Sequence, residues 1–70
     1  MALGSVPDGM ALHQTYELYI EPEDGSPHLE VITCPDEVDL LSAVQEMIAQ
    51  RALRSVEVRR FGSHLFTVTA

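Results

Sequence analysis

The chain has 70 residues, a formal net charge of −7 and a hydrophobic content of 46%. This length allows one domain with a small core, and this hydrophobic content excludes general disorder. No apolar stretch reaches the ~18 residues of a membrane-spanning helix, and the segment Met1 to Gln14 lacks the positive charge of a secretory signal. The single cysteine, Cys34, has no partner for an internal disulfide. We therefore expect a cytoplasmic protein with no membrane association.

Charge is distributed unevenly along the chain. Residues 1–46 contain ten acidic residues and no Lys or Arg, which gives −10, whereas residues 47–70 contain four arginines and one glutamate, which gives +3. We expect the two segments to attract each other within one fold. A nucleic-acid-binding surface needs net positive charge to neutralise phosphates, so this balance makes nucleic acid an unfavoured partner. The alternative hypothesis is nucleic-acid association through the arginine cluster Arg51, Arg54, Arg59 and Arg60.

Residues 1–13 are predicted to form a flexible tail ahead of a single domain over residues 14–70. Glycine, proline and aspartate interrupt any period in this tail. The segment from Thr15 to Glu21 then alternates, which is typical of a half-buried strand. Its inward face carries Tyr16, Leu18 and Ile20. A turn with Pro22 and Gly25 is predicted to connect it to a second strand.

The second strand is predicted from His28 to Thr33. Its alternation is interpreted with Leu29 and Val31 facing the core and Ile32 facing outwards. The two strands together form a hairpin with an acidic loop.

A helix is predicted from about Cys34 to about Ala52. Pro35 suits the first helical position, and Asp36 and Glu37 oppose the positive end of the helix dipole. Cys34 is then the N-cap residue. The apolar stripe that faces the sheet is expected to comprise Leu40, Leu41, Val44, Met47 and Ile48, with Leu41 and Val44 buried most deeply.

Two further strands are predicted, from Ser55 to Arg59 and from His64 to Thr69. The inward apolar residues of both strands share a face only if the loop has three residues, Arg60-Phe61-Gly62. The expected fold is α+β: a ββαββ chain with a four-stranded antiparallel sheet in the order 2-1-3-4 and the helix on one face. This order places Glu17 and Glu21 beside Arg59 on the exposed sheet face.

No catalytic or metal-binding motif stands out. Cys34 at a helix start suggests a thiol-dependent activity, but Asp36, Glu37 and Asp39 in the same turn disfavour the thiolate. His13, His28, His64 and Cys34 do not have the spacing of a zinc site. We therefore expect no enzyme activity, no metal and no cofactor, and we keep thiol chemistry at Cys34 as an alternative hypothesis.

The exposed sheet face suggests a different role. Tyr19, Ile32 and Leu65 are predicted to point away from the helix, with Arg59 among the charged residues at their rim. Several apolar side chains inside a polar rim resemble a small protein interface. The leading hypothesis is a non-catalytic protein-interaction module that binds an unknown protein partner or forms a homodimer across this face.

Overall fold

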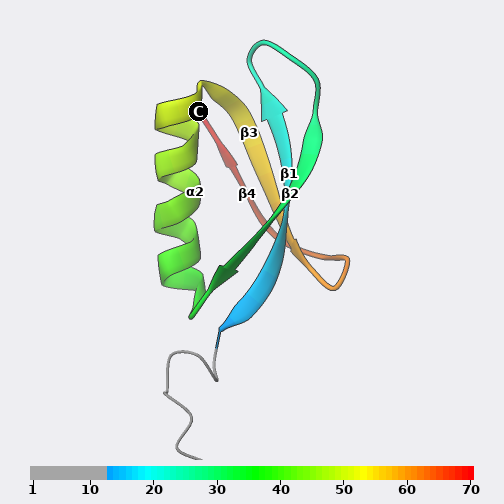
Figure 1. Ribbon diagram of the computed structural model, residues 1–70, viewed down its shortest axis with the longest axis vertical. Coiled ribbons are helices and arrows are strands. Elements are labelled where there is room, and N and C mark those ends of the chain that lie inside the picture. Colours follow the sequence, from blue (N-terminus) through cyan, green and yellow to red (C-terminus); the bar gives the residue numbers. More distant parts are fainter. Residues whose placement is uncertain (1–12) are drawn as a thin grey trace, which may run out of the picture.

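The computed structural model describes residues 13–70 and shows a β-β-α-β-β chain (Figure 1). Its strands form one antiparallel sheet in the order β2-β1-β3-β4, and α2 lies on one face of this sheet. The predicted class and strand order are confirmed. The predicted tail lies outside the described residues, apart from His13, which directly precedes the first strand. The elements are β1 (Gln14–Pro22), β2 (His28–Cys34), α2 (Glu37–Arg51), β3 (Leu53–Arg60) and β4 (Ser63–Thr69).

The core lies between α2 and the inner face of the sheet. Every second residue of β1 is buried there, as the alternation predicts. Each buried aliphatic or aromatic side chain contributes roughly 1.5–3 kcal/mol relative to an exposed one, so this small set provides most of the stability. The buried residues are Tyr16, Leu18, Ile20, Cys34, Leu40, Val44, Leu53, Val56 and Val58.

β2 faces the opposite way from the prediction. Ile32 lies opposite Tyr16 and Glu30 lies opposite Leu18, and opposed residues of an antiparallel pair share a face. Ile32 therefore packs against the core, whereas Leu29 and Val31 point to solvent. The physical reason is that both faces of β2 carry apolar residues, so the alternation alone does not choose between them.

The start of α2 also differs from the prediction. Asp36 is the N-cap residue, and its Oδ1 accepts a hydrogen bond from the Asp39 N–H at 2.9 Å. Cys34 is the last residue of β2 instead of the cap, because aspartate satisfies a free N–H of the first turn far better than cysteine.

The buried stripe of α2 is centred on Leu40 and Val44. Leu40 is 0% exposed but Leu41 is 39% exposed, so the expectation that Leu41 is deeply buried is wrong. Leu41 lies about 100° further around the helix than Leu40, which turns it towards the margin of the sheet. Met47 and Ile48 are partly buried against the core, as the stripe predicts.

The β3–β4 connection has two loop residues instead of the predicted three. Arg60 pairs with Ser63, and Phe61 and Gly62 between them both have positive φ, at 52° and 81°. Positive φ at both central residues indicates a type I′ turn. The register then shifts after Val58, where Leu65 is an extra residue in β4. Because of this bulge, the inward apolar residues of β3 and β4 still share one face of the sheet, which was the reason for predicting a three-residue loop.

Candidate functional site

The sheet face opposite α2 is not covered by any other element of the described residues (Figure 1). We call it the open face. The register places its residues in rows across the strands β2-β1-β3-β4. One row is Leu29-Tyr19-Glu57-Thr67 and the next is Val31-Glu17-Arg59-His64.

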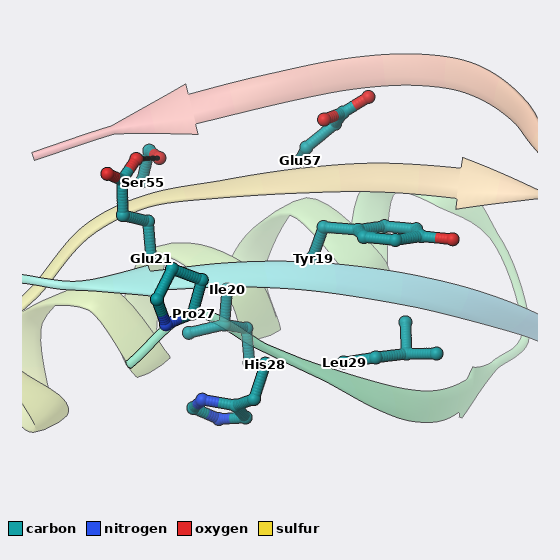
Figure 2. Close-up of a pocket in the computed structure, with 8 residues that line it drawn as sticks. All are labelled: Tyr19, Ile20, Glu21, Pro27, His28, Leu29, Ser55 and Glu57. Carbon is teal, nitrogen blue, oxygen red and sulfur yellow. Dashed lines mark hydrogen bonds between the residues drawn. The ribbon is translucent and has the colours of Figure 1, made fainter. Parts of the chain in front are cut away.

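Three large apolar side chains lie together on the open face. Tyr19, Leu29 and Val31 are 41%, 53% and 62% exposed, and we call them the apolar strip. Tyr19 is directly opposite Leu29, and Val31 is two residues further along β2 on the same face. Figure 2 shows Tyr19 and Leu29 on adjacent strands, at an open hollow of about 530 Å³ whose wall also includes His28 and Glu57.

Arg59 and Glu57 form the polar border of the apolar strip on β3. The Arg59 Nε–H donates to Glu57 Oε2 at 2.8 Å, and the guanidinium carbon lies 5.0 Å from the centre of the Tyr19 ring. Arg59 thus bridges a carboxylate and an aromatic ring at the surface. Glu17 lies opposite Arg59, as predicted, but its carboxylate accepts from the Gly62 N–H at 3.3 Å, and Glu21 is opposite Ser55.

The structure brings together only part of the predicted patch. Tyr19 and Arg59 share the open face, as predicted. Ile32 and Leu65 instead pack against the buried core, so the expectation of one exposed patch with Tyr19 is wrong. Ile32 is not on the open face because β2 faces the opposite way from the prediction, and Leu65 is not there because it is the bulge residue of β4.

Sequence reasoning missed Leu29 and Val31. The signal that could have placed them is Glu30, which lies between them and faces the helix side. Its carboxylate accepts two hydrogen bonds from the Arg51 guanidinium, at 3.2 and 2.5 Å. Glu30 Oε2 also lies 2.8 Å from His28 Nε2. The hydrogen bonds from Arg51, and next the one with His28, lower the pKa of Glu30 to about 2.

Cys34 is buried at the end of β2. Burial is the main cause that raises the pKa of its thiol, and the negative charges of Asp39 and Asp36 raise it further. A nucleophilic cysteine needs the opposite environment, with a depressed pKa and solvent access. This geometry gives no support to the hypothesis of thiol chemistry.

Three of the four arginines are engaged within the molecule. Arg51 binds Glu30, and Arg59 binds Glu57. The Arg60 guanidinium carbon lies 5.1 Å from the centre of the Phe61 ring. Guanidinium groups that are already paired with carboxylates offer less to phosphates, which weakens the nucleic-acid hypothesis.

Residues 13–70 contain no group of three or more His, Cys, Asp or Glu side chains arranged to hold a metal ion. The one described helix is too short and too polar to cross a membrane. The chain matches no protein-family model, no curated protein and no solved structure with which it was compared.

Proposed function

We propose that this protein is a non-catalytic interaction module that binds a protein partner through the apolar strip of Tyr19, Leu29 and Val31. The observation that supports the proposal is the exposure of these three adjacent side chains on a sheet face that no other described element covers. Single apolar residues are common on surfaces, but a contiguous group inside a polar rim is typical of an interface.

The residues around the strip favour a partner of particular chemistry. Tyr and Arg are enriched among the residues that dominate binding energy, and Tyr19 lies directly under Arg59. Glu17 and Glu21 form an acidic margin, whereas the Glu57 carboxylate is paired with Arg59. The expected partner therefore presents an apolar patch bordered by Lys or Arg, because opposite charges accelerate association and select the partner. The free thiol of Cys34 suits a reducing compartment, so we expect this partner in the cytoplasm.

Site-specific photo-crosslinking in the source cell tests the proposal. A photoreactive residue at Leu29 is expected to trap a specific protein, whereas the same residue at Gln45, on the exposed side of α2, is the matched control and is expected to trap none. The substitution Val31→Asp should then weaken binding of the purified partner by tenfold or more, because it places a charge in the strip. Equal crosslinking at the two positions, or equal binding by Val31→Asp, would contradict the proposal.

A further inference from the structure

The two edges of the sheet are protected differently. β2 carries Glu30, a charge that points to the helix side of the sheet and pairs with Arg51. Inward-pointing charges on an edge strand prevent it from adding another strand. β4 (Ser63–Thr69) contains no Lys, Arg, Asp, Glu or Pro. Apart from the bulge at Leu65, the β4 edge therefore lacks the usual features that prevent strand addition, and its segment from Phe66 to Thr69 is regular.

The backbone of β4 offers free hydrogen-bonding groups along this edge. The Ala70 N–H donates to the Arg54 oxygen at 3.0 Å, which marks a hydrogen-bonded position between β3 and β4. Such positions alternate with non-bonded ones along an antiparallel pair. The N–H and C=O groups of Thr67 and Thr69 therefore point away from β3, towards the open edge.

An apolar groove lies beside the same edge. Val38 and Leu41 of α2 form one wall, and Phe66 and Val68 of β4 form the other, around a volume of about 470 Å³. Val38 in the first turn of α2 is 74% exposed, and Leu41, one turn further along the same side of the helix, is 39% exposed. A strand added to β4 would extend the sheet surface that forms the β4 wall of this groove.

We propose that a second copy of the chain occupies this edge, so that two β4 strands pair across a two-fold axis into one continuous eight-stranded sheet. A two-fold interface uses the same patch on both copies and closes on itself. The alternative pairing of β4 with the β2 edge of another copy would not close, and Glu30 on β2 opposes it.

The register of β4 makes the strand complementary to itself. Free backbone groups must pair with free backbone groups, so Thr67 of one copy lies opposite Thr67 or Thr69 of the other. In either register, Phe66 and Val68 of both copies lie on the helix side, because opposed residues share a face. The two helices therefore lie on the same side of the junction between the two β4 strands, which we call the seam. Val38 and Leu41 of each copy then lie beside the apolar surface formed by Phe66 and Val68.

The charge distribution supports a second copy as the occupant. Each molecule carries −7, so self-association needs a contact that avoids the acidic residues. β4 is uncharged, and the groove beside it includes one acid, Glu37. Most of the acidic residues belong to other elements, including the β1–β2 hairpin. This dimer leaves both apolar strips free, because they lie on the opposite side of the sheet.

Sedimentation equilibrium of the full chain between ~1 and ~100 μM tests this inference, since a micromolar dimer forms over that range. The expected result is a mass that rises from 7.7 kDa to twice that value. In hydrogen exchange, the amides of Thr67 and Thr69 should become protected as concentration rises. A wild-type chain that stays monomeric throughout, or a dimer without this protection, overturns the proposal.

Three variants make the test specific. Thr67→Pro removes an outward N–H without removing a β3–β4 hydrogen bond, so the dimer should be lost while the fold is kept. Val38→Glu suits the N-terminal turn of a helix but places two charges beside the seam, and should weaken the dimer at least tenfold. Val31→Glu, on the open face, is the control and should dimerise normally. If Val31→Glu abolishes the dimer, or Val38→Glu leaves it unchanged, the interface is not at β4.

Discussion

The exchange of Leu40 for alanine is the most direct test of how α2 packs. Leu40 is fully buried at the centre of the stripe, and truncation of such a leucine costs ~2–5 kcal/mol through lost burial and the cavity that remains. A domain of this size has a total stability of roughly 3–9 kcal/mol. Since 1 kcal/mol shifts Tm by ~4–8 °C in small domains, Leu40→Ala should lower Tm by at least ~8 °C.

Leu41→Ala is the matched control, because it removes the same atoms from the next residue of the same helix. Leu41 keeps over a third of its surface in water, and alanine favours the helix, so its cost should stay below ~1 kcal/mol. Both variants should be unfolded by heat and by urea at the same concentration of ~1 μM, the low end of the range over which a micromolar dimer assembles, with helix content followed by circular dichroism. Equal losses in the two variants, or a larger loss for Leu41→Ala, would refute the facing of α2.

Three further predictions concern ionisation and the turn. Arg51→Gln should raise the pKa of Glu30 from about 2 towards 4.5, which an NMR titration of its carboxyl carbon would measure. Because folding lowers the pKa of Glu30, its contribution to stability is complete above pH 4.5 and is lost as pH falls through about 2. Glu30→Gln should remove this dependence of stability on pH. Cys34 of the native chain should react with iodoacetamide more slowly than Cys34 of the denatured chain at neutral pH, and Asp39→Asn should speed the native reaction. Equal rates in the native and denatured chains would contradict the raised pKa of the thiol. Phe61→Asn should raise Tm. Phe61 is 85% exposed and has φ 52°, a left-handed conformation that costs ~1–2 kcal/mol for most residues and that Asn adopts more easily. The contact between the Phe61 ring and Arg60 offsets only ~0.5–1 kcal/mol of this cost. A Tm that falls instead would show that the aromatic contact is the stronger effect.

The sequence predicted the architecture well because strong local signals defined most elements. The alternation of Tyr16, Leu18 and Ile20 fixed the inner face of β1, since its other positions are polar apart from Tyr19. The strand order followed from two hairpins joined by a helix, because few topologies allow short connections. The predicted β3–β4 loop was wrong because Leu65 forms a bulge, and no local pattern distinguishes a bulge in the strand from an extra residue in the loop.

The candidate site could not be predicted because it depends on the facing of β2, where the competing faces are nearly balanced. Leu29 and Val31 lie on one face, and Ile32 lies on the other. Because Cys34 was assigned to the helix cap, Ile32 was the one apolar residue counted on its face of β2, against Leu29 and Val31 on the other face. This imbalance favoured the wrong face. Cys34 in fact ends β2 on the same side as Ile32, which makes the count two against two.

With the apolar residues balanced, the ion pair between Glu30 and Arg51 favours the observed facing of β2. A slip of one residue would turn Glu30 to the open face, away from Arg51, and would bury Leu29 and Val31. The observed facing therefore produces two features at once. It exposes the apolar strip on which the proposed function depends, and it places a charge on the β2 edge that leaves β4 as the edge able to add a strand.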